Sequence, residues 1–343
     1  MGDRSLAFEL LSHLWLHEPD ADTIARAVDE FGQTCEVAKT SQVFATDTIA
    51  RAVGELGLPA ADPAELALAY ADVFLLNVYP YGTAFADPSG ELNGPEAQRI
   101  AALYETDGYC PPELNSVGAP DHLGLCLGFL AHLEEKRLRR DDFLSGFLEW
   151  APVCCLAVER EPAAHLFYRA LAALTRDVLL KRFALRLTQH RERPSGREAS
   201  HWDATRNTPP TSPQSAVLPL EFGAEVSLRD ILRFFLAPAR CGMFLSRSRL
   251  GQMAASRELG LRLPFGSRGD VAESLFASVG EAEAIPQLLT ALESEAEVWA
   301  ETYRLWAERY PTWQPTAGVW LSRMEAALQT VAGLRHVLAS EPM

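Results

Sequence analysis

The side chains with the clearest potential for chemistry are Asp121 and His122, which open a predicted helix after a long irregular loop. Pro120 precedes them, and proline suits the first turn of a helix, where Asp can cap free backbone N–H groups. His122 adds a group that titrates near neutrality, beside a carboxylate and at the positive end of a helix dipole. As bare chemistry, the two residues form either a general acid–base pair or a helix cap with an exposed histidine.

No nucleophile or third catalytic member can be assigned to this pair from the sequence. The phosphate loop G-x-x-x-x-G-K-[ST], H-E-x-x-H, G-x-S-x-G and G-x-G-x-x-G are all absent, and the eight histidines lack metal-ligand spacing. Residues 266–270 (Gly-Ser-Arg-Gly-Asp) precede a predicted helix and could hold an anion, but a plain turn with Asp270 as N-cap is favoured. We therefore expect no catalytic residues and no metal site.

The composition predicts an acidic, soluble globular chain. Its 343 residues are 48% hydrophobic and 22% charged, and the formal net charge is −15. This charge argues against nucleic acid as a partner and favours a cationic ligand. Charges interrupt every apolar run before the roughly 18 residues that cross a bilayer, and no secretory signal is evident. We expect a cytoplasmic protein without membrane insertion.

The six cysteines contain no C-x-x-C pair, which is typical of reduced thiols that fill a core. Cys154 and Cys155 are adjacent, and adjacent cysteines seldom bridge each other. Burial without reactivity is favoured for them, and a redox role is the alternative.

The hydrophobic periodicity predicts an all-α chain. Residues 22–32 recur at 47–57 as a second short capped helix, although two copies do not make a solenoid. A stretch rich in Pro, Ser and Thr is predicted to be a flexible linker or loop. The organisation is thus a helical bundle domain at 1–188, a linker at 189–216 and a helical region at 217–343. Other helices are predicted at 4–16, 63–78, 95–106, 120–138, 141–158, 161–187, 227–236, 247–258, 270–279, 281–310 and 316–338.

An aromatic stripe marks the C-terminal region. Its residues follow helical spacing and then continue past two prolines that break the helix. Helix-packing core is the favoured interpretation, and an exposed groove for a peptide is the alternative. The stripe consists of Trp299, Tyr303, Trp306, Tyr310, Trp313 and Trp320.

Three further segments share their order, spacing and loop placement with one protein family. They are 70–74 (Tyr-Ala-Asp-Val-Phe) with 79–85 (Tyr-Pro-Tyr-Gly-Thr-Ala-Phe), 120–130 (Pro-Asp-His-Leu-Gly onward), and 150–152 (Trp-Ala-Pro) with 167–172. Over roughly residues 5–187 the chain resembles the TorD/DmsD family of cytoplasmic chaperones for molybdenum enzymes. Residues 242–268 also look like longer members of that group.

The resemblance implies an all-helical, TorD-like chaperone without catalysis of its own. Such chaperones bind the twin-arginine leader of a molybdopterin oxidoreductase precursor, hold it until its cofactor is inserted, and block premature export. The resemblance implies no tightly bound cofactor, although transient contact with the molybdopterin cofactor or with GTP of the client system is compatible with it. A homodimer formed by helix exchange is compatible with it as well.

The same resemblance implies a leader-binding site. In relatives this site is lined by an aromatic-x-x-Leu-Phe helix, a Pro-aromatic loop and the Asp-His pair. A leader brings two arginines and an apolar helix-forming stretch, so it needs carboxylate acceptors and aromatic or apolar faces. Tyr81 is the best candidate for exposure, whereas Phe74 and Trp150 taken alone are more often core residues. The predicted site comprises Tyr70, Val73, Phe74, Pro80, Tyr81, Pro120, Asp121, His122 and Trp150.

The chain departs from the family pattern on the helix after His122. Relatives usually carry an acidic residue where this chain has Cys126, and often another at Gly128, which weakens any pairing of this helix with arginines. Gly124 and Gly128 lie four residues apart and should instead let a neighbouring helix approach closely.

Two other functions stay open at this point. One is a weak nucleotide-binding or hydrolysing protein that uses Asp121 and His122 or the turn at 266–270. The other is a helical assembly factor that binds the mature subunit and not its leader.

Overall fold

The chain is all-α over the residues that the structure describes. The computed structural model describes residues 3–23, 25, 62–90, 92–191, 220 and 227–340. Within these ranges the only extended pairing is one isolated antiparallel bridge, between Tyr81 and His122. None of the helices among these residues is long and apolar enough to cross a membrane.

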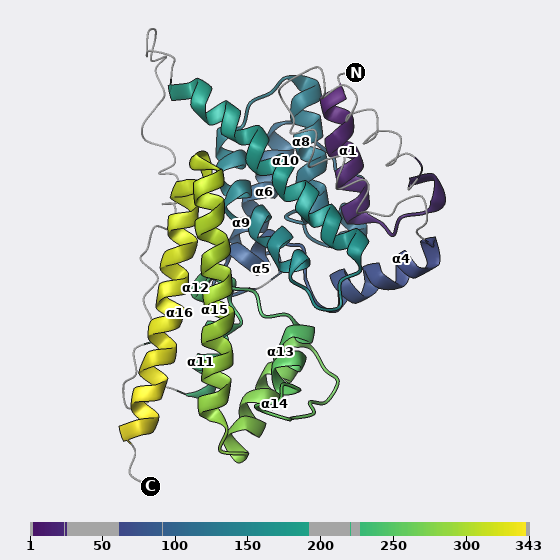
Figure 1. The fold of residues 1–343 in the computed structure, drawn as a ribbon. Helices are drawn as coiled ribbons and strands as arrows, with labels where there is room; N and C mark the ends of the chain where they lie inside the picture. Colours follow the sequence, from purple (N-terminus) through teal and green to yellow (C-terminus); the bar gives the residue numbers. More distant parts are fainter. Residues whose placement is uncertain are drawn as a thin grey trace.

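The N-terminal part is a bundle built around α8 and α9 (Figure 1). Both helices are buried along most of their length because apolar residues surround them on nearly every side. The bundle contains α1 (Asp3–Leu16), α4 (Pro63–Tyr70), the π-helix η2 (Ala71–Leu75), α5 (Gly82–Ala86), α6 (Pro95–Thr106), α7 (Leu114–Val117), α8 (Leu123–Lys136), α9 (Asp141–Glu159) and α10 (Leu166–Arg191).

Two glycines let α1 lie close against α8. A Cβ on Gly124 would lie 2.5 Å from Leu16 Cγ and 3.1 Å from the Ser12 carbonyl oxygen. A Cβ on Gly128 would lie 3.1 Å from the Ser12 hydroxyl and would also meet the hydroxyl of Tyr109. The Ser12 hydroxyl donates a hydrogen bond of 2.7 Å to the Gly124 carbonyl. The expected close approach is therefore present, and α1 is the neighbouring helix.

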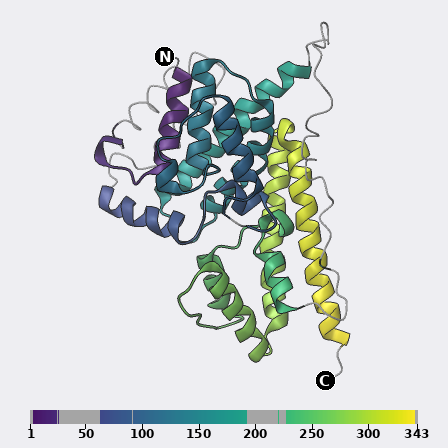
Figure 2. The ribbon, with the colours of Figure 1, turned by 180° about the vertical axis from the view of Figure 1, so that it is seen from behind.

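The C-terminal region is dominated by a long hairpin of α15 and α16, whose closed end lies beside α9 and α10 (Figures 1 and 2). The predicted aromatic stripe is buried there, so its interpretation as core is confirmed. The region contains α11 (Leu228–Phe235), α12 (Pro238–Cys241), α13 (Arg247–Ala254), α14 (Arg268–Glu281), α15 (Ile285–Arg309), the 3-10 helix η3 (Pro311–Trp313) and α16 (Gln314–Ser340).

A proline inside α9 explains how the hairpin is joined to the bundle. Pro152 has no N–H to donate to the carbonyl of Leu148, four residues earlier. The indole N–H of Trp313 donates to that carbonyl instead, at 2.9 Å. The indole N–H of Trp320 donates to the next carbonyl, that of Glu149, at 2.8 Å. The two tryptophans thus bury apolar area and also satisfy backbone acceptors of α9.

A buried carboxylate forms a second joint. Glu295 on α15 accepts from Arg160 at the end of α9 (2.8 Å), from Arg249 on α13 (2.5 Å) and from the Trp299 indole (2.8 Å). Burial raises the pKa of Glu295, but the two arginines outweigh it and the net shift is downward. The carboxylate of Glu295 therefore links α15 to α13 and to the end of α9.

The described helices follow the predicted ones in order and position. The predicted helix 63–78 is instead α4 followed by a π-turn, and the helix predicted at 161–187 begins at Leu166 and ends at Arg191. The short helices α5, α7 and α12 were not predicted because four or five residues carry too little periodicity. Most of the repeat at 22–32 and 47–57, and most of the linker at 189–216, lie outside the described residues.

We predict that Gly124→Ala destabilises the protein by about 1–3 kcal/mol, because the added methyl group overlaps Leu16 and the backbone of α1. Gly318→Ala is the matched control, since a Cβ on Gly318 of α16 has no neighbour within 4 Å and should add roughly 0.5–1 kcal/mol of helix stability. Urea unfolding followed by tryptophan fluorescence measures both. Equal effects of the two substitutions would contradict close packing at Gly124.

Candidate functional site

The Pro-aromatic loop and the Asp-His segment are joined through their backbones. The N–H of Gly82 donates to the carbonyl of Asp121 at 2.9 Å, and the N–H of Leu123 donates to the carbonyl of Pro80 at 2.7 Å. These bonds flank the bridge between Tyr81 and His122. Two segments about 40 residues apart therefore form one rigid unit at the starts of α5 and α8.

Asp121 caps α5 and not its own helix. Its carboxylate Oδ2 accepts from the backbone N–H of Thr83 at 2.6 Å and also from the Thr83 hydroxyl. The cap of α8 is His122, whose Nδ1 accepts from the N–H of Gly124 at 3.1 Å. The expectation that Asp121 caps the helix it precedes is therefore wrong, because the loop at 79–83 brings a closer set of donors.

Burial shifts the titration of both side chains. It raises the pKa of Asp121, and the hydrogen bonds from Thr83 offset that rise only in part. It lowers the pKa of His122 to about 3, with a smaller contribution from nearby His17. The expectation of a histidine that titrates near neutrality is thus wrong. An uncharged histidine that caps a helix and a carboxylate held by Thr83 leave no acid–base pair at the surface.

The residues of the predicted aromatic helix pack into the core. Val73 and Phe74 are buried, and the ring of Phe74 lies 5.1 Å from that of Trp15 and 5.3 Å from that of Tyr168. Tyr70 is half-buried and donates through its hydroxyl to the carbonyl of Trp15 at 3.2 Å. The core interpretation of Phe74 is confirmed, so this motif positions the helix and offers little surface of its own.

Trp150 is likewise a core residue, and it explains why the loop carries a glycine. A Cβ on Gly82 would lie 2.9 Å from Cε2 and 3.0 Å from Nε1 of Trp150. The indole N–H and the Oδ1 atom of Asp121 are both buried without a hydrogen-bond partner among the described residues. The first turn of α5 therefore fits between α9 and the start of α8 with room for nothing larger than glycine.

Only the rim of this unit is accessible. Tyr81 is half-buried, with its hydroxyl on the carbonyl of Val117 (2.7 Å) and its ring 5.0 Å from that of His122. Pro120 is half-buried, and its carbonyl accepts from Tyr104 at 2.9 Å. Pro80, Asp121 and His122 are buried, so the exposed polar tip expected from the sequence is absent in this conformation. Leader binding by the nine residues stays a prediction.

Two partners of the unit are absent from the predicted site. Thr83 holds Asp121, and the signal for it was its place directly after the Pro-aromatic pair and glycine. Tyr104 donates to Cys126 with an O–S distance of 3.7 Å, and both residues are buried. The missing acidic residue at position 126 therefore has a physical reason, because a carboxylate there would be buried beside Asp121.

The turn at 266–270 is a helix cap. Ser267, not Asp270, is the N-cap of α14, and Asp270 completes a capping box by accepting from the Ser267 N–H at 2.9 Å. Arg268 turns inward and donates to the carbonyls of Leu245 (2.6 Å) and Leu236 (2.9 Å). The N–H groups of Ser267 and Asp270 and the cation of Arg268 are thus already engaged within the protein.

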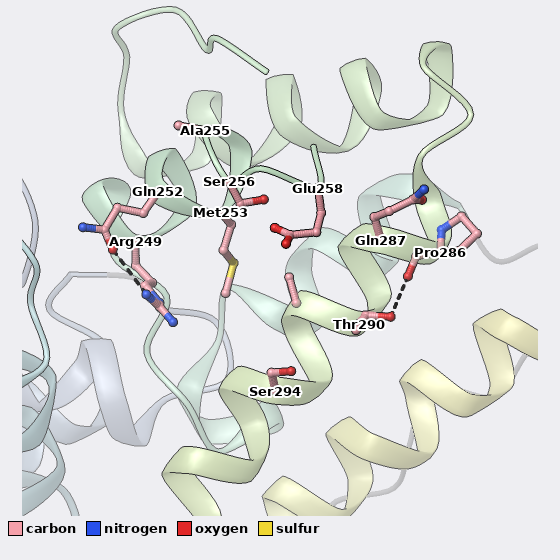
Figure 3. Close-up of a pocket in the computed structure, with 11 residues that line it drawn as sticks. Arg249, Gln252, Met253, Ala255, Ser256, Glu258, Pro286, Gln287, Thr290 and Ser294 are labelled. Carbon is pink, nitrogen blue, oxygen red and sulfur yellow. Dashed lines mark hydrogen bonds between the residues drawn. The ribbon is translucent and has the colours of Figure 1, made fainter. Parts of the chain in front are cut away.

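A separate cleft of about 970 Å³ lies between α13 and α15 (Figure 3). The guanidinium of Arg249 on its wall is paired with Glu295 and bonded to Gln252 at 3.2 Å. Glu258 comes from the loop after α13, and the rest of the wall consists of hydroxyl, amide and apolar groups, including the thioether of Met253. Among the described residues, no hydrogen bond joins a lining hydroxyl to the carboxylate of Glu258 to form a nucleophile–base pair. Its lining residues are Arg249, Gln252, Met253, Ala255, Ser256, Glu258, Pro286, Gln287, Thr290, Ala291 and Ser294.

The described cysteines are free thiols, and all but Cys110 are buried. Burial raises the pKa of Cys154 and of Cys155, which keeps both as unreactive thiols near neutral pH. Among the described residues no group of three or more His, Cys, Asp or Glu side chains is arranged to hold a metal ion.

One comparison with known proteins identifies a family for part of the chain. Residues 38–155 match the family model described as nitrate reductase delta subunit, a stretch that covers about a third of the chain. These residues form a chaperone domain of the TorD/NarJ type. No curated protein and no solved structure matches the chain.

The TorD/NarJ-type domain contains the bridged unit of α5 and α8 and ends within α9. Its family consists of maturation chaperones for redox enzymes, and this family implies binding to a molybdoenzyme subunit. The burial of Asp121 and His122 in this domain agrees with a structural role for the pair.

We predict that Asp121→Ala destabilises the domain by about 1–3 kcal/mol, because the buried donors of Thr83 lose their acceptor. Asp121→Asn should cost less, since an amide oxygen can still accept. The folded pKa of Asp121 lies above its ordinary value of 3.8, so its stabilising contribution is complete below that value and is lost as the pH rises through the folded pKa. The free energy of unfolding of the Asn variant, relative to that of the wild type, should therefore increase between about pH 4 and pH 7. Urea unfolding at both pH values tests this, and equal losses for Ala and Asn would contradict the capping role.

The stability that His122 contributes depends on pH in the opposite direction. An unfolded histidine binds a proton near pH 6.5, whereas folded His122 does so only near 3, so stability is full above 6.5 and falls as the pH drops. One such group gives a slope of about 1.4 kcal/mol per pH unit. His122→Asn keeps an acceptor for the N–H of Gly124 but does not titrate. Its stability should depend less steeply on pH than that of the wild type, and identical slopes in urea titrations would argue against a neutral, buried His122.

Proposed function

We propose that the chain binds the twin-arginine leader of a molybdenum oxidoreductase precursor and holds the precursor while its molybdopterin cofactor is inserted, before export. The match to the TorD/NarJ-type chaperone domain carries this proposal. A protein with this role works on the cytoplasmic side and contacts the cofactor, or GTP of the client system, only transiently.

Convergence of the family-like segments supports the proposal. The loop at 79–85, the segment at 120–124 and Trp150 of the third segment lie far apart in sequence. They nevertheless meet around the first turn of α5, through the bridge to His122 and the contact of Gly82 with Trp150. A rigid frame of this kind lets the rim around Tyr81 and Pro120 keep one shape, which lowers the entropy lost when a peptide binds.

The charge of the chain also favours such a ligand. A net charge of −15 attracts a segment that carries two arginines, and guanidinium groups form strong bidentate bonds with carboxylates. The buried carboxylate of Asp121 is engaged with Thr83, so exposed acidic side chains are better acceptors for those arginines in this conformation.

Isothermal titration of the full chain with a synthetic leader of the co-encoded molybdoenzyme tests the proposal. We expect binding that weakens at least tenfold when both arginines become alanine, because two charge-assisted contacts of about 1.5–3 kcal/mol each are lost. A leader with a lysine pair should bind with an affinity between those of the arginine and alanine leaders, since lysine keeps the charge but loses the bidentate geometry.

Equal affinity for the arginine and alanine leaders would overturn leader recognition. Capture of leader-deleted enzyme with the affinity of the full precursor would instead support an assembly factor for the mature subunit.

A further inference from the structure

An exposed row of leucines runs along the continuous helix of α4 and η2. Leu68, Leu75 and Leu76 are 76%, 61% and 39% exposed. Leu68 lies on α4, and Leu75 and Leu76 lie at the end of η2, while Val73 and Phe74 between them are buried in the core. This helix therefore presents apolar side chains both to the core and to the surface, which is unusual for a helix with no further partner.

Acidic side chains lie within the same row. Glu65 precedes Leu68 by three residues and Asp72 follows it by four, which places both on the side of the leucines. Both carboxylates are accessible to solvent. The side chain of Arg247 comes only to 3.9 Å from Asp72, so the carboxylate is not bonded to it tightly. The surface thus alternates apolar groups with negative charge.

The C-terminal region adds an aromatic ring to this surface. Phe265 is 86% exposed, and the guanidinium of Arg247 lies 4.6 Å from the centre of its ring. Arg247 thereby lies between Phe265 and Asp72. The start of α13 is held against η2 by Asn77, whose side-chain oxygen accepts from the N–H of Ser248 at 2.9 Å. In both ribbon views the loop after α13 extends along the side of the molecule that carries α4 (Figures 1 and 2).

We propose that this surface is where a basic, helix-forming segment of the leader docks. The assignment rests on the proposed function and adds a location and a contribution from outside the TorD/NarJ-type domain. We call the surface the leucine–phenylalanine face, and it consists of Leu68, Leu75, Leu76 and Phe265 with the carboxylates of Glu65 and Asp72.

Charge complementarity selects this occupant. An amphipathic helix can pack its apolar side on the exposed leucines, and its basic residues can meet Glu65 and Asp72. A second copy of this chain fits less well, because symmetric pairing would bring the same carboxylates together in a chain of net charge −15. The ring of Phe265 and the leucines supply the apolar area that such a helix buries.

The test is titration of the full-length double variant Leu75→Ser/Phe265→Ser with the synthetic leader. Both positions are exposed, so thermal unfolding should be unchanged and the loss can be assigned to the surface. We expect affinity to fall roughly tenfold or more, as follows from two large apolar contacts. Asp72→Asn should reduce affinity mainly at low salt. Leu305→Ser is the matched control, since Leu305 is 53% exposed on α15 and should leave affinity unchanged.

The outcomes separate this inference from the proposed function. Wild-type binding that the double variant retains in full overturns the docking surface and leaves leader recognition standing. No binding by the wild type overturns both. Loss of self-association in sedimentation, with leader affinity intact, would identify the face as an interface between copies and also overturn the proposal.

Discussion

The buried carboxylate of Asp121 is the constraint on which the candidate site depends. It accepts from the backbone N–H of Thr83 at the start of α5, where the N-cap residue, Tyr81, makes no side-chain capping bond. Because a buried carboxylate is stable only with such partners, the loop before α5 has little freedom to move away from the start of α8. The backbone bonds of Gly82 and Leu123 follow from this placement, and so does the contact between Gly82 and Trp150.

The need to satisfy buried backbone groups also explains how the C-terminal region is joined to the bundle. Pro152 leaves the carbonyl of Leu148 without its helical donor, and a buried carbonyl in that state would be costly. Trp313 supplies the missing donor, and Glu295 binds Arg160 from the end of the same helix. Helix α9 is thus the element shared by both parts of the chain, with α5 packed on one portion and the α15–α16 hairpin on another.

These arrangements give the motif residues a structural role. The aromatic helix and the Asp-His pair belong to a maturation chaperone domain, yet most of their side chains are buried. Their polar atoms mostly stabilise the domain itself, because Oδ2 of Asp121 is bonded to Thr83, Nδ1 of His122 to the N–H of Gly124, and the hydroxyl of Tyr70 to the carbonyl of Trp15. The accessible apolar side chains of this helix are instead Leu68, Leu75 and Leu76, which are 76%, 61% and 39% exposed.

The sequence by itself determined the helical class, the order of the long helices, the burial of Phe74, Trp150 and the aromatic stripe, and the close approach at Gly124. Each of these depends on local periodicity or residue size, which a single chain displays directly. Only the tertiary structure decided which helix Asp121 caps, that His122 stays neutral, and that Leu75 and Phe265 face solvent together. Those features depend on contacts between distant segments, where burial sets the pKa and decides which side of a helix is free.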